Sequence, residues 1–327
     1  MARPLRIQYP GAVYHVTGRG NERRPIFNDD DDRRDFLEIL AESLTTYRAV
    51  LHGFVLMANH YHLLLETPLG NLGELMRHFN ITYTSRFNRR HGRSGHLYQG
   101  RYKSFLIDRE AYLSAVSRYI HLNPVKVGEM REKGAAEQLA YLWHYRWSSL
   151  PGFIGLKQRY DFVRYGPVLE EFGGDNRSGR AAYKKQLSMD LGRGLPLHEK
   201  IVAQSVLGDA SFVAMINEKY LAEQKKDREC PAIGIVHSFA SRKTILEALE
   251  KALAKPRAEI FAGAGVERQI AMELLYRLAG MKNKEIGELM GVDYSTVSQG
   301  RKRLRQRQKT DEEVRRLIGK IEQFCQE

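Results

Sequence analysis

The order of strand-like and helix-like segments over the first 123 residues most constrains the fold. Apolar runs typical of strands occupy residues 12–20, 49–57, 60–67 and 102–108, and apolar residues at helical spacing occupy residues 29–48, 71–88 and 109–123. Only Ala58 and Asn59 separate the second and third strand-like runs, which predicts a tight antiparallel hairpin. The resulting order, β-α-β-β-α-β-α, predicts an α+β fold with a ferredoxin-like antiparallel sheet against which the last helix lies.

The rest of the chain predicts two further parts. Residues 156–255 are predicted to be a helical connector of unknown role, in which residues 172–186 have linker composition and residues 209–227 carry the apolar stripe of a helix. From about Pro256 to residue 325 the pattern is helical throughout. The predicted domains are therefore residues 1–155, 156–255 and 256–327.

The charge balance indicates the class of partner. The chain has 52 Lys and Arg against 39 Asp and Glu, a formal net charge of +13. Such an excess favours a polyanion and governs association more than fold, so nucleic acid is the first candidate partner. A basic surface without a dedicated ligand is the alternative.

Cysteine usage and hydropathy exclude several other classes. Cys230 and Cys325 are far apart and have no neighbouring ligand pairs, which argues against a disulfide framework or a zinc finger. No apolar stretch approaches the roughly 20 residues that span a bilayer, and the first residues lack the apolar centre of a signal peptide. We expect a cytoplasmic, nucleoid-associated protein without a membrane partner.

Two histidines at strand spacing form the first candidate site. His60 and His62 are two apart in a strand-like run, so both imidazoles point to the same side of the sheet, opposite to Tyr61. They could share a divalent cation, or they could simply fill a half-buried polar sheet face. Neutral imidazole suits Mn, Zn and Ni, and oxygen ligands shift the preference toward Mg or Mn.

A tyrosine and an asparagine on a later helix give such a cation a use. Tyr119 and Asn123 are four apart and share one helical face, whereas His121 points elsewhere. Asn123 could supply an amide oxygen as third ligand while Tyr119 presents its phenol to whatever the metal holds. A tyrosine of pKa near 10 is only about one part in a thousand phenolate at neutral pH, so it needs an activator. A cation on a phosphodiester oxygen favours attack at phosphorus.

Tyr112 is an alternative nucleophile. It lies seven residues before Tyr119, about two helical turns away on nearly the same face. Tyr119 is preferred because it pairs with Asn123 one turn later, and core packing is the simpler role for Tyr112.

Five ordered segments resemble a known family. The segments "GAVYHVTGRGNERRPIF", "MANHYHLLLET", "HLYQGRYKSFLID", "SRYIHLNPVKVG" and "YRWSSLPGF" are similar to the HUH-type single-tyrosine transposases, specifically the REP-associated branch, over about residues 5–155. The resemblance implies an HUH transposase-like fold and metal-dependent cleavage and rejoining of single-stranded DNA, with a 5′-phosphotyrosine intermediate. It implies that Tyr119 is the nucleophile, that His60 and His62 bind the metal, Mg or Mn, and that Asn123 stands at the third ligand position.

Basic and aromatic residues surround these segments. The predicted DNA contacts of the first domain are Arg19, Arg23, Arg24, Arg101 and Lys103. Tyr83, Phe87, Tyr98 and Tyr102 are interleaved with basic residues, and this composition is typical of a surface that follows the phosphates of a single strand and stacks its bases.

The C-terminal part contains three helical patterns. The first is marked by Ile270 and Leu274, the second ends at Gly291, and the third runs over residues 295–309 after a candidate cap at Asp293. This order predicts a helix-turn-helix, although ordinary bundle packing explains the periodicity equally well. In a helix-turn-helix the third helix contacts bases and phosphates. The predicted contacts are Ser295, Thr296 and Gln299 to base edges and Arg301 and Arg303 to phosphates.

The same region resembles a second family. The segments "RQIAMELLYRL", "KEIGELMG" and "DYSTV" are similar to the DNA-binding domain of the replication initiator DnaA over about residues 255–310, with Tyr294 where the family usually has His. The whole sequence therefore predicts a transposase that nicks and rejoins single-stranded DNA hairpins and also binds duplex DNA. A non-catalytic DNA-binding regulator and an RNA-binding protein are the alternatives, and monomer and homodimer stay equally open.

Overall fold

The computed structural model describes residues 6–195, 197, 201–202, 205–221, 240–279 and 281–325. Contacts within the chain divide it into two compact units, Arg6–Ile201 and Val202–Glu327, which we call the N-terminal unit and the C-terminal unit. The division falls inside the segment predicted to be a connector, and the three predicted domain ranges stay a prediction. Cys230 and the end of the helix predicted over residues 209–227 lie outside the described residues.

The N-terminal unit begins with the predicted order of strands and helices. The elements are β1 (Ala12–Arg19), α1 (Asp30–Thr46), β2 (Val50–Leu56), β3 (His60–Thr67), α2 (Leu72–Arg90), β4 (Lys103–Ile107) and α3 (Arg109–His121). Within this unit the strands are ordered β2-β3-β1-β4, and every neighbouring pair is antiparallel. This is the ferredoxin-like arrangement, so the predicted α+β fold class is confirmed.

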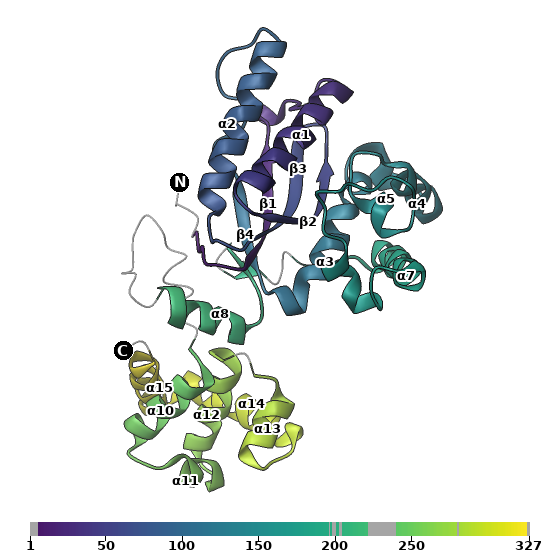
Figure 1. Ribbon diagram of the computed structural model, residues 1–327. Helices are drawn as coiled ribbons and strands as arrows, with labels where there is room; N and C mark the ends of the chain where they lie inside the picture. The colour runs from purple at the N-terminus through teal and green to yellow at the C-terminus, as the bar shows by residue number, and fades with distance from the viewer. Residues whose placement is uncertain are drawn as a thin grey trace. The chain divides into compact units, whose positions relative to one another are not determined.

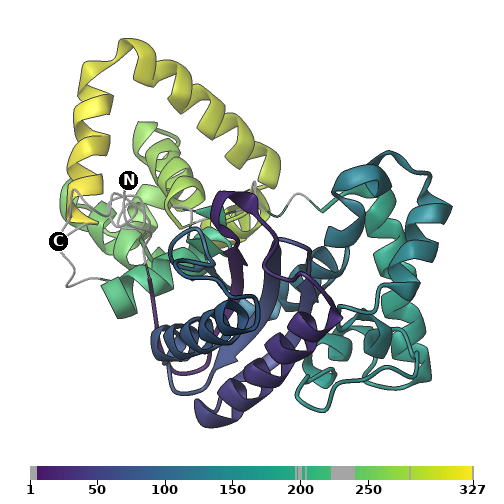
Figure 2. The ribbon, with the colours of Figure 1, turned by 90° about the horizontal axis from the view of Figure 1, so that it is seen from above.

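The two faces of the sheet have different coverings. Helices α1 and α2 lie side by side on one face (Figures 1 and 2), where Phe36 packs against Tyr61 and Phe79 at ring-centroid distances of 5.1 and 4.8 Å. The N-terminus of α1 is capped by the Asp29 carboxylate, which accepts a hydrogen bond from the Asp32 backbone N–H at 2.9 Å. Helix α3 packs on the opposite face, against β2 and β3.

Helix α3 ends two residues earlier than predicted. The expected end was Asn123, but α3 stops at His121 and a short 3-10 turn, η2 (Asn123–Val125), follows. Pro124 has no backbone N–H to donate to the Ile120 carbonyl, and the Asn123 side-chain amide donates to that oxygen instead, at 3.2 Å. The helix end is therefore closed by a side chain rather than by another helical turn.

The remainder of the N-terminal unit is helical. Its elements are η1 (Asn21–Arg23), η3 (Gly128–Glu132), α4 (Ala135–His144), α5 (Leu150–Phe153), α6 (Gly166–Leu169), η4 (Glu170–Phe172) and α7 (Arg177–Arg193). The prediction of a linker over residues 172–186 was wrong, because α7 covers much of this segment. Asn176 caps the helix by accepting from the Gly179 N–H, and Tyr183 and Leu187 are fully buried. Few apolar residues mark this helix, so its sequence pattern is weak.

The C-terminal unit is almost wholly helical where it is described. Its elements are α8 (Ala210–Ile216), the π-helical turn η6 (Asn217–Leu221), α10 (Arg242–Leu253), α11 (Arg257–Ala262), α12 (Val266–Arg277), α13 (Asn283–Met290), α14 (Tyr294–Thr310) and α15 (Glu312–Phe324). Two-residue strands β5 (Ile201–Val202) and β6 (Val206–Leu207) lie near the boundary of the units. Figure 2 shows α14 and α15 as two long helices joined by a sharp turn.

The three helices predicted near the C-terminus are present as α12, α13 and α14. Helix α13 ends at Met290 and is followed by Gly291, whose φ of 65° lies in the left-handed region that glycine adopts without strain. Helix α14 passes close to α12 at Gly300, where an added Cβ would lie only 2.8 Å from the Met272 sulfur. Tight packing at Gly300 and a glycine turn at Gly291 thus fix how α14 is held within this unit.

Candidate active site and nucleic-acid interface

The predicted histidine pair lies on β3 and faces α3. His60 and His62 share one face of the strand, and their ring centroids are 5.1 Å apart. Tyr61 points to the opposite face, where its hydroxyl donates to Asn80 at 3.1 Å. The prediction that both imidazoles lie together, away from Tyr61, is confirmed.

A third histidine completes this cluster, and sequence reasoning missed it. His15 on β1 stacks on His62 with ring centroids 5.0 Å apart, and its Nε2 lies 2.8 Å from His62 Nδ1. The register pairs Thr17 of β1 with His62, so His15, two residues before Thr17, faces the same side. Alternation along "AVYHVTGR" could have flagged His15, but only the strand register brings it to His62.

Burial keeps the histidine pair neutral. It lowers the pKa of His60 to about 4, and the nearby Arg19 guanidinium adds to the effect. Burial also lowers the pKa of His62 well below its usual range, helped by His15 and then His60. A neutral imidazole keeps one nitrogen lone pair, which is the form that binds a metal ion.

The hydrogen bonds of His60 and His62 leave the Nε2 atom of each ring able to bind a cation. His62 Nε2 is buried and has no hydrogen-bond partner in the described part of the chain. His60 Nδ1 lies 2.7 Å from the Asn59 side-chain oxygen, so this nitrogen carries the proton and Nε2 the lone pair. Among the described residues, no group of three His, Cys, Asp and Glu side chains could hold a metal. The two histidines therefore fit a cation that takes its other ligands from amide, water or phosphate oxygens.

Tyr119 lies beside the histidine cluster. Its ring centroid is 5.8 Å from that of His15 and 6.5 Å from that of His62. The Lys126 ammonium sits 3.9 Å from the centre of the phenol ring. Burial raises the pKa of Tyr119, so the phenol needs help to ionise. Burial also lowers the pKa of Lys126, to about 8.

Asn123 is held close to Tyr119, as its sequence spacing predicted. Its side-chain amide nitrogen donates to the Tyr119 backbone carbonyl at 2.9 Å, and the side chain is almost fully buried. The Asn123 side-chain nitrogen is used in hydrogen bonds at the end of α3. The side-chain oxygen is therefore the atom that would bind a metal ion. Tyr112 is half-buried two turns earlier on α3, whereas the histidine ring contacts described above are made by Tyr119.

The basic residues predicted to bind DNA in this unit are on the surface, but most of the aromatic ones are not. The exposed side chains are Arg19, Arg23, Arg24, Arg101 and Lys103. Tyr83, Phe87 and Tyr102 are buried, and the Tyr98 hydroxyl is enclosed. Tyr83 donates to the Ile26 carbonyl inside the unit, at 2.6 Å. Base stacking on Tyr83, Phe87 and Tyr102 was therefore a wrong prediction, because these rings are buried in the unit.

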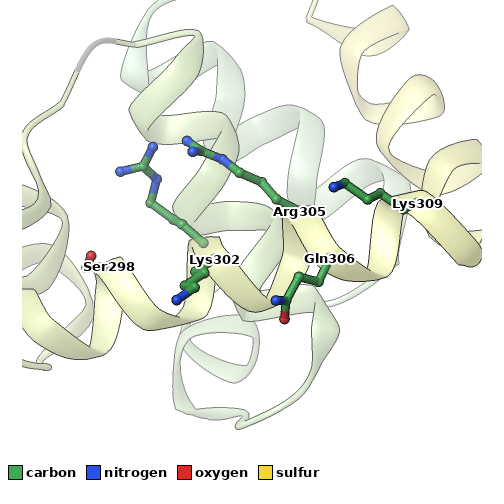
Figure 3. A pocket seen from close by; sticks show the side chains of 6 residues that line it. Ser298, Lys302, Arg305, Gln306 and Lys309 are labelled. Atoms are coloured by element: carbon green, nitrogen blue, oxygen red, sulfur yellow. The ribbon is translucent and has the colours of Figure 1, made fainter.

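Helix α14 of the C-terminal unit presents a basic, polar surface. Ser295, Gln299 and Arg303 are exposed and Thr296 is half-buried. A cavity of 390 Å³ is lined by Ser298, Arg301, Lys302, Arg305, Gln306 and Lys309. Figure 3 shows the labelled members of this group leaving α14 along its length.

Arg301 does not lie where a phosphate contact requires. It is only 7% exposed, and its guanidinium donates to Glu273 at 2.9 Å and to Asn283 at 2.8 Å. The guanidinium also stacks over the Tyr276 ring. This arginine therefore joins α12, α13 and α14 from inside, and its predicted phosphate contact is corrected to a structural role.

One known family matches part of the N-terminal unit. Residues 8–123 match the family model described as "Transposase IS200 like", a segment that spans the four strands and α3 and ends at Asn123. Over this segment the N-terminal unit is therefore similar to that family. A solved structure described as the REP associates tyrosine transposase bound to a REP hairpin has a TM-score of 0.39 and 16% identity to this chain. The aligned part covers 51% of this chain and 93% of the chain in that structure.

One comparison gave no match, and the described helices were also considered as membrane spans. No curated protein matches the chain. None of the helices in the described ranges has the length and apolar character needed to cross a bilayer.

Proposed function

We propose that the N-terminal unit nicks and rejoins single-stranded DNA through a covalent bond between Tyr119 and a 5′ phosphate. The observation that carries this proposal is the position of the Tyr119 ring, 6.5 Å from that of His62, whose buried Nε2 has no partner among the described residues. A nucleophile beside an unused, neutral ligand nitrogen is the arrangement that metal-assisted phosphodiester cleavage requires. The match of residues 8–123 to IS200-like transposases supports the same class of reaction.

The proposed step balances without any further reactant. Tyr119 Oη forms a bond to phosphorus, loses its proton, and displaces the 3′ oxygen of the neighbouring nucleotide, which leaves as a 3′-hydroxyl after taking up a proton. Attack by a 3′-hydroxyl on the phosphotyrosine reverses the step and rejoins the strand. Lys126 favours ionisation of Tyr119, because its ammonium lies 3.9 Å from the ring centre.

His60, His62 and Asn123 are the proposed ligands of a divalent cation, Mg or Mn. When bound, such an ion withdraws charge from a phosphate oxygen and makes phosphorus more electrophilic. His15 holds His62 in orientation through the 2.8 Å contact between their ring nitrogens. The exposed basic residues, Arg19 among them, would hold the phosphates of a hairpin-forming strand.

We also propose that α14 binds duplex DNA as the last helix of a DnaA-like helix-turn-helix. Ser295 and Gln299 are exposed at its start, where base edges would be contacted, and Arg303 is exposed further along. Lys302 and Arg305 add positive charge at the cavity in Figure 3. This surface would direct the N-terminal unit to particular DNA.

The experiment that tests the strand-transfer proposal is a covalent adduct assay. Single-stranded oligonucleotides that tile the DNA flanking the gene are incubated with the protein and Mg²⁺ or Mn²⁺, and the DNA–protein adduct is resolved under denaturing conditions. We expect an adduct with the unmodified protein and none with Tyr119→Phe. Tyr112→Phe is the matched control and should keep the adduct.

The opposite results have specific meanings. An adduct that persists in Tyr119→Phe and disappears in Tyr112→Phe would overturn the assignment of the nucleophile. DNA binding without any adduct in the unmodified protein would indicate the non-catalytic regulator instead.

A further inference from the structure

Helix α3 has a second face, distinct from the one that carries Tyr119, and this face is polar but buried. Ser114, Ser117, Arg118 and His121 recur at helical spacing and form a polar stripe. Such a stripe normally faces water, but the exposed fractions of these four side chains are only 4, 0, 7 and 0%. Buried polar groups need partners, so something in the fold must be built to meet them.

Ser114 and Arg118 of the stripe contact the segment that follows α6. Arg118 donates through Nε to Asp190 of α7 at 2.5 Å and through Nη1 to the Ser114 hydroxyl at 2.8 Å. Ser114 in turn donates to the Glu171 carboxylate. The Arg118 guanidinium also lies 5.5 Å from the centre of the Phe172 ring. A buried cation is thus paired and hydrogen-bonded between α3, η4 and α7.

Ser117 and His121 of the stripe form hydrogen bonds with one tyrosine and one serine. The Tyr183 hydroxyl lies 2.9 Å from the Ser117 hydroxyl and 2.7 Å from His121 Nδ1. His121 Nε2 lies 2.8 Å from the Ser149 hydroxyl, which accepts a hydrogen bond from the Phe54 N–H of β2 at 2.9 Å. The network therefore ties α3 both to α7 and to the sheet.

We propose that Ser149, Glu171, Tyr183 and Asp190 form a brace that positions Tyr119 for attack. The proposal rests on the proposed function, in which Tyr119 is the nucleophile. Tyr119 lies directly between residues of the stripe in sequence, so any rotation of α3 moves its phenol. A rotation of about 20° shifts an atom ~6 Å from a helix axis by about 2 Å, and misplacement of about 1 Å can cost about 100-fold in rate.

The brace gives a role to a segment for which sequence patterns suggested none. Glu171, Tyr183 and Asp190 all lie beyond residue 123, where the match to IS200-like transposases ends. They fall in the range predicted to be a connector, yet they belong to the same compact unit as the sheet. In this chain the segment acts as a positioning device for the helix of the nucleophile.

Tyr183→Phe tests the brace with little disturbance to packing. It removes the hydroxyl that joins Ser117 and His121 but keeps the ring that stacks on Phe153 at 5.0 Å. Tyr165→Phe is the matched control, because Tyr165 is also buried and also packs on Phe153, at 4.8 Å. Its hydroxyl accepts from the Tyr160 N–H and not from α3.

Three quantities are measured for each full-length variant with an oligonucleotide that forms the adduct. They are the single-turnover rate constant of adduct formation at saturating DNA, the Kd for that DNA, and amide hydrogen exchange across α3. For Tyr183→Phe we expect a rate constant about 10- to 100-fold lower, an unchanged Kd and faster exchange in α3. Tyr165→Phe should match the unmodified protein in all three. Asp190→Asn, which leaves Arg118 without its carboxylate, should repeat the result through a second contact.

Each contrary outcome is distinct. A normal rate constant and normal α3 exchange in Tyr183→Phe would overturn the brace while the proposed function stands. An equal loss in Tyr165→Phe, or a Kd that rises together with the fall in rate, would also overturn it, because general destabilisation would then explain the effect. Absence of any adduct in the unmodified protein would remove the proposed function, and the brace with it.

Discussion

The two units place their proposed functional side chains in different surroundings. In the N-terminal unit the proposed metal ligands His60 and His62 are half-buried and buried, and burial lowers the pKa of His60 to about 4. In the C-terminal unit the groups proposed to act, such as Arg303, are exposed, and the buried arginine, Arg301, is structural. Both units also bury an arginine against a carboxylate, Arg118 with Asp190 and Arg301 with Glu273.

This contrast follows from what each proposed task requires. A metal ligand must be a neutral imidazole with a lone pair, which burial secures at neutral pH. A phosphate contact must be a charged side chain that can release counterions when it meets DNA, which requires exposure. A buried Arg–carboxylate pair serves neither task and instead fixes how helices lie together. Position in the fold therefore decides the role of a basic residue more than its type does.

The largest expected effect is the loss of a proposed metal ligand. His62→Ala should lower the rate of adduct formation by about 1000-fold at limiting Mn²⁺, equivalent to about 4 kcal/mol of transition-state stabilisation. The measurement is the adduct rate as a function of Mn²⁺ concentration. His96→Ala is the control, since His96 is exposed. An unchanged Mn²⁺ dependence in His62→Ala would remove the metal role from the histidine pair.

The next effect tests the structural arginine of the C-terminal unit. Arg301→Met leaves the nearly buried Glu273 without its main partner, and breaking such a pair costs about 3–5 kcal/mol of unfolding free energy. We expect the lower end, about 3 kcal/mol, because Arg305 also donates to Glu273 at 3.1 Å. Urea unfolding followed by circular dichroism measures it. Lys302→Met, one residue later and exposed, should change stability by less than about 0.5 kcal/mol; a similar loss there would contradict the structural role.

Much of the site could be predicted because its signals are local. Strand alternation put His60 and His62 on one face, and helical spacing brought Asn123 to Tyr119, since each relation involves residues at most four apart. His15 escaped because it meets His62 only through the pairing of β1 with β3, which the local pattern does not specify.

The wrong prediction for Arg301 has another physical cause. Periodicity reports which residues lie on a common face but not what covers that face. The basic run around Arg301 predicted a DNA-facing surface, and no partner was predicted for Arg118 of α3. Both arginines are buried because a carboxylate distant in sequence, Asp190 or Glu273, meets them. Such pairs appear only when the tertiary packing is known.

A smaller effect is expected for the exposed arginine of α14. Arg303→Ala should weaken duplex DNA binding by about 5-fold, roughly 1 kcal/mol, and lower the slope of log K against log salt by about 1. Its unfolding free energy should stay unchanged. The measurement is a series of fluorescence anisotropy titrations at several salt concentrations. Arg316→Ala on α15 removes the same charge from another exposed position, and an equal change of slope there would show that net charge alone is responsible.

The smallest effect concerns pH and the start of α7. Hydrogen bonds from Arg159 and Arg180 lower the pKa of Asp175 below its usual value of 3.8. Because the folded-state pKa is depressed, the stabilisation is present above about pH 4 and is lost as pH falls through the folded-state pKa. Since Asp175 is partly exposed, we expect only about 0.5 kcal/mol. Asp175→Asn should lower the unfolding free energy by this amount at pH 7 and match the unmodified protein near pH 2. A constant difference at both pH values would instead mean that the shape of the side chain, and not its charge, holds the two arginines.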